Sequence, residues 1–191
     1  MIVGKNRRGP KRSSRGLTLV ELAMAMTLLA IALVGYAKTV ANASVATSTS
    51  REVVLASEAG RRMIETLRSE DFATIFARYN SSVADDPGGV VSPGANFAIT
   101  GLDAIPIDVD GRPGEIIFPV TLVGGAPQLL ENVVDTKLGM PSDLNGDGII
   151  DGIDRATTAP LYQNLPVIIR VRWRGIGGPG VVEFQTVLGD I

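Results

Sequence analysis

The sequence predicts an α+β protein, in which one long N-terminal helix packs on a small antiparallel β-sheet. The first reason is an apolar segment, residues 17–37, followed by a stretch without proline, residues 51–79, that has helical periodicity. The second is a pair of segments near the C-terminus, starting at Val167 and Val182, in which every second residue is apolar except Thr186. A period of two residues is typical of strands with one buried face.

Charge is distributed unevenly along the 191 residues. Residues 1–16 hold six of the 18 Lys and Arg residues and none of the 20 acids. Next to an apolar segment, such a block is typical of a cytoplasmic positive flank, which places the N-terminus inside and the C-terminus outside. A nucleic-acid-binding arm is the alternative.

The sequence has no cysteine or histidine. This excludes Ser-His-Asp and Cys-His catalysis, and we expect that the protein is not an enzyme.

The apolar segment is long enough to cross a membrane. Its 21 residues, 17–37, span ~30 Å at ~1.5 Å per residue, and Glu21 is their only charge. A carboxylate near the top of a membrane helix is costly, about 2.5–3.5 kcal/mol at the helix centre and less near the interface, so we expect Glu21 to have a function. A plain signal peptide, cut near Ala41-Asn42-Ala43, is the alternative.

The run Arg15-Gly16-Leu17-Thr18-Leu19-Val20-Glu21-Leu22 resembles the cleavage and assembly signal of type IV pilins and pseudopilins. The resemblance implies that a prepilin peptidase cuts between Gly16 and Leu17 and that the new N-terminus is methylated. Glu21 is then the fifth mature residue and faces the N-terminal amine of a neighbouring subunit. Leu17 departs from the family pattern, in which phenylalanine or methionine usually follows the cut.

The resemblance also implies a function and a location. We expect a structural subunit, a minor pilin or pseudopilin, of a type IV pilus or type II secretion filament. Its partners are the prepilin peptidase and other pilin or pseudopilin subunits. It crosses the bacterial inner membrane once, with the C-terminal domain outside the cytoplasm, and enters a periplasmic or surface filament. A membrane-anchored, calcium-dependent adhesin is the alternative, and an anchored enzyme is a more remote one.

Four parts follow along the chain: a leader (1–16), a transmembrane and assembly helix (17–38), its amphipathic continuation (39–80) and a β-rich domain (81–191). One helix over about 18–78 is predicted, because apolar residues recur at helical spacing and chain breakers first appear at residues 85–89. The weakly polar stretch 42–50 is a place where this helix can loosen. The positions expected to face the sheet are Ala56, Gly60, Met63, Ile64 and Leu67.

Two hairpins are predicted in the domain. The first joins residues 105–109 to 115–123 through a turn rich in glycine and proline. The second joins 167–174 to 182–188, with Arg170, Arg172 and Arg174 on the face opposite the apolar residues. This arginine stripe is interpreted as a solvated face or subunit contact rather than a nucleic-acid surface, because no aromatic residues interleave with it.

Residues 143–154 read Asp-Leu-Asn-Gly-Asp-Gly-Ile-Ile-Asp-Gly-Ile-Asp and predict a calcium-binding loop. Ca²⁺ takes oxygen ligands at roughly 2.3–2.6 Å, and such a loop supplies them at fixed positions. Gly148 permits the sharp turn, and Ile150 is the expected apolar anchor. The predicted ligands are the side chains of Asp143, Asn145, Asp147, Asp151 and Asp154 and the backbone carbonyl of Ile149.

Aspartate at the last position resembles the dockerin-type calcium repeat. No second repeat is present, so cohesin binding is not implied, and a simple Asp-Gly turn is the alternative. We expect Ca²⁺ to hold the otherwise irregular segment 124–164 against the sheet. Asp108 and Asp110 form a second acidic pair, which we interpret as part of a turn.

Overall fold

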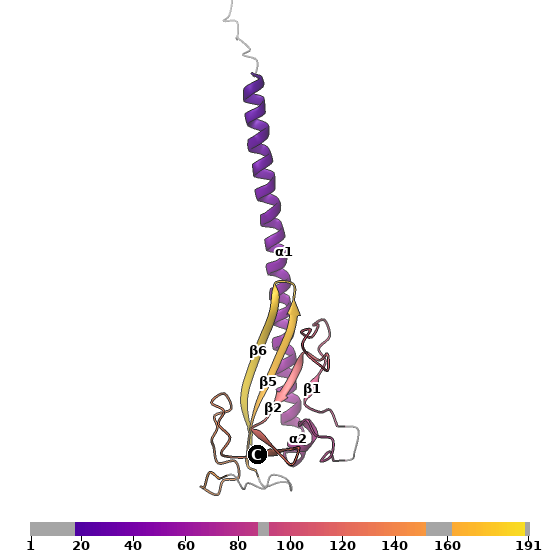
Figure 1. Cartoon of the computed structure of the whole chain (residues 1–191), viewed down its shortest axis with the longest axis vertical. Coiled ribbons are helices and arrows are strands. Elements are labelled where there is room, and N and C mark those ends of the chain that lie inside the picture. The colour runs from indigo at the N-terminus through magenta and orange to yellow at the C-terminus, as the bar shows by residue number, and fades with distance from the viewer. Residues whose placement is uncertain (1–17, 88–91, 152–161, 190–191) are drawn as a thin grey trace, which may run out of the picture. The chain divides into compact units, whose positions relative to one another are not determined.

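The computed structural model describes residues 18–87, 92–151 and 162–189. The chain divides into two units, Met1–Ser44 and Val45–Ile191. The described part of the first unit is helical, and the second contains the end of the same helix, a short second helix and two small sheets (Figure 1). This arrangement confirms the predicted α+β class.

The first helix, α1, spans Leu19–Ser69 without interruption. The weakly polar stretch 42–50 does not break it. A hydroxyl group within this stretch and one just before it bond back to the helix: Ser50 Oγ donates to the Ala46 carbonyl at 2.9 Å, and Thr39 Oγ1 donates to the Gly35 carbonyl at 3.0 Å. These polar side chains therefore find partners within the helix.

The prediction of one helix to residue 78 was wrong in its last turns. Helix α1 ends at Ser69, and α2 (Phe72–Tyr79) starts anew after Asp71. The Asp71 carboxylate accepts a hydrogen bond from the Ala73 N–H at 3.3 Å, and its backbone is extended. An N-cap of this kind starts a helix, and here it changes the direction of the chain.

The main sheet has the strand order β1-β2-β5-β6, and all neighbours are antiparallel. The strands are β1 (Asn96–Phe97), β2 (Gly114–Ile117), β5 (Asn164–Gly175) and β6 (Gly178–Gly189). The β5–β6 hairpin is the predicted one, with Val167 opposite Thr186 and Val171 opposite Val182. The apolar residues of β5 at 167, 169, 171 and 173 are buried, as the alternation predicts.

The other predicted hairpin was wrong. Residues 105–109 form no strand; a turn forms instead, in which the Asp108 N–H donates to the Ile105 carbonyl at 2.9 Å. Residues 115–123 fall into β2 and a separate strand, β3 (Val120–Val123), because Pro119 lies between them and cannot donate to a sheet. Strand β3 pairs with β4 (Ala126–Leu129) in a second, two-stranded sheet.

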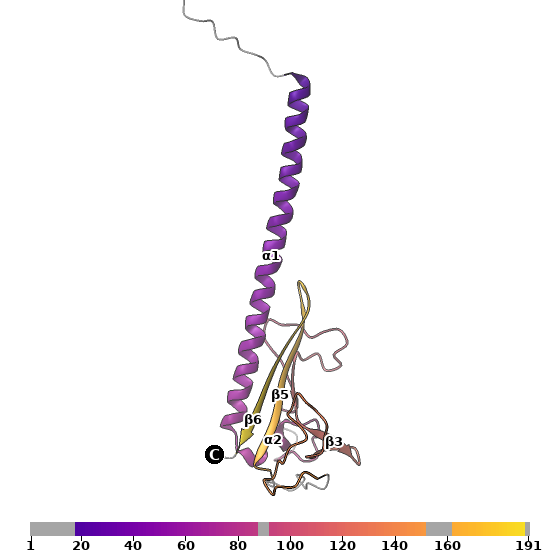
Figure 2. The same cartoon turned by 90° about the vertical axis from the view of Figure 1, so that its left-hand side faces the viewer.

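Within the second unit, α1 lies along the β5–β6 hairpin (Figure 2). The predicted face of the helix makes this contact: Ala56, Gly60 and Leu67 are buried, and Met63 and Ile64 pack against the core. A side chain at Gly60 would overlap the Phe184 ring, so only glycine permits this close approach. The core also contains Ile75 and Phe76 of α2 and the inner faces of β2 and β5.

Polar contacts hold the tip of the β5–β6 hairpin to the helix. The carboxylate of Glu52 on α1 accepts hydrogen bonds from Trp173 Nε1 and from the Ile176 N–H, both at 3.2 Å. Trp173 is the only tryptophan of the chain, and it is buried. The indole N–H therefore has the partner that a buried tryptophan needs.

Candidate functional site

The start of α1 is a capping box. The Glu21 carboxylate accepts hydrogen bonds from the Thr18 N–H at 2.9 Å and from the Thr18 hydroxyl at 3.0 Å, while the Glu21 N–H donates to the same hydroxyl at 3.3 Å. This reciprocal arrangement satisfies backbone donors that a helix start leaves unpaired. Glu21 therefore has a local structural role that its place in the cleavage signal did not suggest. Gly16 and Leu17 lie outside the described residues.

The first half of α1 exposes an apolar surface on all sides. Helix α1 contains a stretch long and apolar enough to cross a membrane, and none of that stretch is buried within the protein. A soluble monomer rarely exposes so much apolar area, so this surface needs lipid or other helices around it. The exposed large apolar residues here are Leu19, Val20, Leu22, Met24, Met26, Leu28, Leu29, Ile31, Leu33, Val34, Tyr36 and Val40.

The predicted calcium loop forms a tight turn over its described part, residues 143–151. The Asp143 carboxylate accepts hydrogen bonds from the Gly146 N–H at 2.6 Å and the Gly148 N–H at 2.8 Å. Gly148 has a φ of 85°, so the sharp turn predicted there is present, and Gly146 has a φ of 80°. The hydrogen bond from the Gly148 N–H, and then that from Gly146, lower the pKa of Asp143 below its ordinary value.

Asn145 and Asp147 continue the same turn. Asn145 Oδ1 accepts from the Asp147 N–H at 2.8 Å, and Asp147 Oδ1 accepts from the Ile149 N–H at 2.8 Å. The two side chains also meet, since Asn145 Nδ2 donates to Asp147 Oδ2 at 3.2 Å. Three of the predicted ligands, at 143, 145 and 147, thus share one turn.

The two remaining predicted side-chain ligands, Asp151 and Asp154, are not part of this turn as described. The Asp151 N–H donates to Glu131 at 3.4 Å, and Asp154 lies outside the described residues. Over residues 18–87, 92–151 and 162–189, no group of three or more acidic side chains is arranged to hold a metal ion. The donor set is rich in the oxygen atoms that Ca²⁺ prefers, but the described part of the loop is held by its own hydrogen bonds.

Glu131 is a residue that the sequence interpretation missed. It is 0% exposed, and its carboxylate accepts backbone hydrogen bonds from both ends of the loop: Leu144 N–H at 2.6 Å, Asn145 N–H at 3.1 Å and Asp151 N–H at 3.4 Å. A buried charge is tolerated only where such donors surround it. Glu131 therefore holds the loop to the end of the β3–β4 hairpin.

The apolar anchor of the loop is also not the predicted one. Ile150 is half exposed, whereas Leu144 is fully buried in the main core. The Leu144 carbonyl accepts hydrogen bonds from the Gln163 N–H at 2.7 Å and the Asn164 N–H at 3.1 Å, next to the start of β5. The anchor is at the second loop position because the chain enters the loop from the core side. The signal available in the sequence was an apolar residue, Leu144, between the polar residues Asp143 and Asn145.

The arginine stripe on β5 belongs to a network of ion pairs. Arg170 Nε lies 2.7 Å from Glu183 Oε1, and Arg170 and Arg172 both approach Glu115, at 3.4 and 3.5 Å. Lys137 Nζ lies 2.6 Å from Glu183 Oε2. Lys137 and then Arg170 lower the pKa of Glu183 below its ordinary value. Acids on β2 and β6 thus offset much of the positive charge of Arg170 and Arg172.

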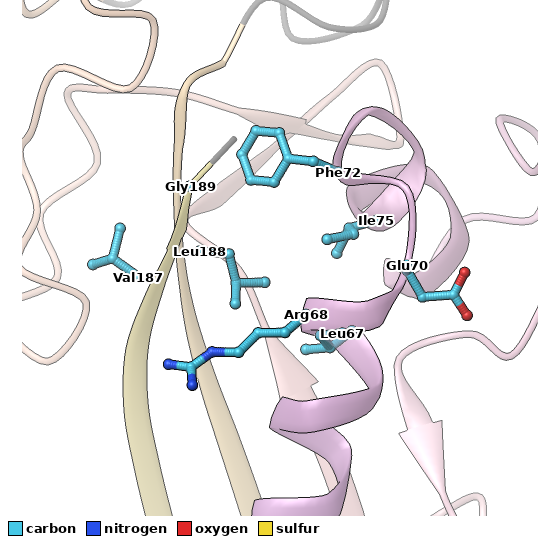
Figure 3. Close-up of a pocket in the computed structure, with 8 residues that line it drawn as sticks. All are labelled: Leu67, Arg68, Glu70, Phe72, Ile75, Val187, Leu188 and Gly189. Carbon is cyan, nitrogen blue, oxygen red and sulfur yellow. The ribbon is translucent and has the colours of Figure 1, made fainter. Parts of the chain in front are cut away.

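One cavity lies where α1, α2 and the end of β6 meet (Figure 3). Its volume is about 290 Å³, and its walls include Leu67, Phe72, Ile75 and Leu188. Arg68 extends toward β6, where its guanidinium donates to the Thr186 hydroxyl at 3.4 Å, and Glu70 points away from the cavity (Figure 3). The lining does not bring together the acid, base or nucleophile that a catalytic site needs.

Comparison with known proteins identifies the N-terminal segment. Residues 11–37 match the family model described as the prokaryotic N-terminal methylation motif. This match confirms the likeness of the N-terminal segment to type IV pilins and pseudopilins. A search of curated proteins found no match, and a search of solved structures found none either.

The matched segment contains Gly16, Leu17 and Glu21 and extends into the apolar half of α1. The motif and the apolar helix together indicate membrane anchoring. The motif also implies processing by a prepilin peptidase and assembly with other pilin subunits. These statements rest on the 11–37 segment alone.

Replacing Glu131 by glutamine tests the role of the buried carboxylate. Glu131→Gln places an amide N–H₂ among backbone N–H donors, and a hydrogen bond to a charged group contributes about 1.5–3 kcal/mol. We expect a loss of about 2–3 kcal/mol in the free energy of unfolding, measured by denaturant titration of the full chain in detergent and followed by Trp173 fluorescence. Glu65→Gln, on the exposed face of α1, is the matched control. Equal stability of the two variants would show that Glu131 does not hold the loop.

Proposed function

We propose that this chain is a structural subunit, a minor pilin or pseudopilin, of a type IV pilus or type II secretion filament, without enzymatic activity. The observation that carries the proposal is the methylation motif over residues 11–37, which extends into the apolar half of α1. A cut after Gly16 makes Leu17 the first residue of the mature chain and Glu21 its fifth. The basic leader then remains on the cytoplasmic side and the C-terminal domain lies outside.

The apolar surface of α1 supports assembly through this helix. In the membrane, lipid covers the exposed side chains between Leu19 and Val40; in a filament, the same helix surfaces of neighbouring copies replace the lipid. Cleavage frees an α-amino group close to the helix start. The Glu21 carboxylate of one subunit pairs with this amine of another, because a carboxylate in apolar surroundings needs a positive partner.

Mass spectrometry of the N-terminal peptide tests this function most directly. We expect the mature chain to begin at Leu17, with a methylated amine, in both membranes and sheared filaments. A Gly16→Leu variant, whose bulky side chain replaces the small residue at the cut, retains the leader and stays in the membrane. An intact leader in the wild-type chain, or a cut near Ala43, would contradict the proposal.

Two substitutions at Glu21 separate its two roles. Glutamine can replace glutamate in a capping box, so Glu21→Gln keeps the hydrogen bonds with Thr18 but removes the charge, whereas Glu21→Ala removes both. If the charge pairs with a neighbouring amine, both variants enter sheared filaments far less than the wild type while their membrane levels stay equal. Assembly of Glu21→Gln at the wild-type level would leave the capping box as the only role of Glu21.

We also propose that the loop at 143–154 binds Ca²⁺. The donors are the side chains of Asp143, Asn145, Asp147, Asp151 and Asp154 and the Ile149 carbonyl. The proposal is supported by the oxygen-rich donor set and by the turn that holds residues 143, 145 and 147 together. The metal would neutralise the loop's carboxylates and link its two halves.

Thermal unfolding with calcium and with a chelator tests the metal site. A ligand at 100 times its Kd stabilises the folded state by about 2.7 kcal/mol, so saturating Ca²⁺ raises the Tm of the wild type. Asp147→Asn keeps the oxygen that accepts from Ile149 but removes a charge, and it reduces the shift. Asp103→Asn, at an exposed aspartate outside the loop, keeps the full shift. Identical melting of the wild type in calcium and in chelator would exclude the site.

A further inference from the structure

We infer that a groove beside α1 binds a second copy of this chain through the segment 107–110. This inference rests on the proposed filament function and adds a contact between the globular domains of neighbouring subunits. It is drawn from two surfaces of the second unit that complement each other in polarity and charge.

The groove runs between α1 and the segment 97–101 and has a volume of about 600 Å³. Half-buried apolar side chains line it, from Leu55, Ala59 and Met63 on the helix and from Phe97 and Ile99 on the opposite wall. An apolar groove of this size on a monomer is typical of a binding site.

The charged residues of the groove are Arg51, Glu58 and Arg62, so its charge is positive overall. Arg62 pairs with Glu58 one turn away at 3.7 Å, and their side chains are 78% and 56% exposed. An ion pair so open to water contributes little to stability. Arg51 is exposed as well, so both arginines are available to a negatively charged partner.

The segment 107–110 has the complementary character. Ile107 is 82% exposed and Val109 103%, and Asp108 and Asp110 alternate with them. The segment is held as a turn by hydrogen bonds from the Asp108 N–H to the Ile105 carbonyl and from the Arg112 N–H to Asp110 Oδ1, both at 2.9 Å. Two apolar side chains thus project from an ordered turn. Its two carboxylates interact with each other and, within the same chain, with Arg172 and Arg112. With Glu115 beside them, the acids still outnumber the arginines, so this surface keeps a negative charge.

The segment 107–110 of one copy fits into the groove of another copy. Ile107 and Val109 of one copy cover the apolar floor of the groove of the next, and Asp108 and Asp110 lie toward Arg51 and Arg62. Because the two surfaces differ, the contact is head-to-tail and repeats along an open array, as a filament requires. The exposed pair Ile149 and Ile150 is a weaker candidate, since Ca²⁺ would neutralise the carboxylates around it.

Cysteine cross-linking in assembled filaments tests the contact, and the absence of native cysteine makes it specific. Two full-length copies are co-expressed, one carrying Ala59→Cys in the groove and the other Val109→Cys. After oxidation of sheared filaments we expect a disulfide-linked dimer. The matched control combines Ala59→Cys with Val134→Cys, an equally apolar residue that is 83% exposed and outside the segment, and it yields no dimer above background.

Charge-reversal variants test whether the disulfide-linked dimer forms through the proposed contact or through random collision of the two cysteines. Asp110→Arg in the Val109→Cys copy should reduce the dimer about tenfold, which corresponds to about 1.4 kcal/mol, and Arg62→Glu in the other copy should restore it. Filaments that form without the dimer, or with the control dimer in equal amount, would overturn this inference and leave the proposed function intact. A wild-type chain that keeps its leader, or is cut near Ala43, would contradict the proposed function itself. A cross-link to a different protein would assign the groove to another partner.

Discussion

The fold depends on the close packing of α1 against the β5–β6 hairpin. Gly60 permits the Phe184 ring to lie against the helix backbone, and Ala56 and Leu67 are fully buried on the same face. Each remaining strand of the main sheet is added outward from this contact, since β2 pairs with β5 and β1 with β2. A larger side chain at position 60 would force the hairpin away from the helix and disturb every layer beyond it. Glu52 adds the polar contact that fixes the hairpin's tip.

The loop at 143–151 is held to the rest of the domain by a polar contact rather than by apolar packing. Glu131 is fully buried, and its carboxylate accepts hydrogen bonds from three backbone N–H groups of the loop at 143–151. Because the carboxylate reaches residues at the start and near the end of this segment, the described loop is held to the core by protein groups. The proposed Ca²⁺ would therefore bind a loop that is already largely formed, and would gain affinity from that preorganisation.

Glu21 shows how one side chain can meet two demands. Its hydrogen bonds with Thr18 start the helix, and the same carboxylate is the group that we propose to pair with a freed amine. A capping box satisfies backbone donors but leaves the negative charge without a cation. A neighbouring subunit's amine would supply that cation, so helix capping and assembly are compatible roles. Arg170 and Arg172 differ from Glu21 in this respect, because acids of the same chain largely offset their charges.

The sequence by itself determined the features that rest on local periodicity. The apolar helix, its sheet-facing residues from Ala56 to Leu67 and the β5–β6 hairpin follow from spacing along the chain, and so does the sharp turn at Gly148. The new helix start after Asp71 and the break between β2 and β3 at Pro119 also have local causes, which were present in the sequence. The tertiary structure decided features that depend on residues far apart in the chain. It left residues 105–109 outside the sheet. It also buried Glu131 and made Leu144 rather than Ile150 the anchor. No local pattern marks a carboxylate whose partners lie 13 to 20 residues away, because only folding brings them together.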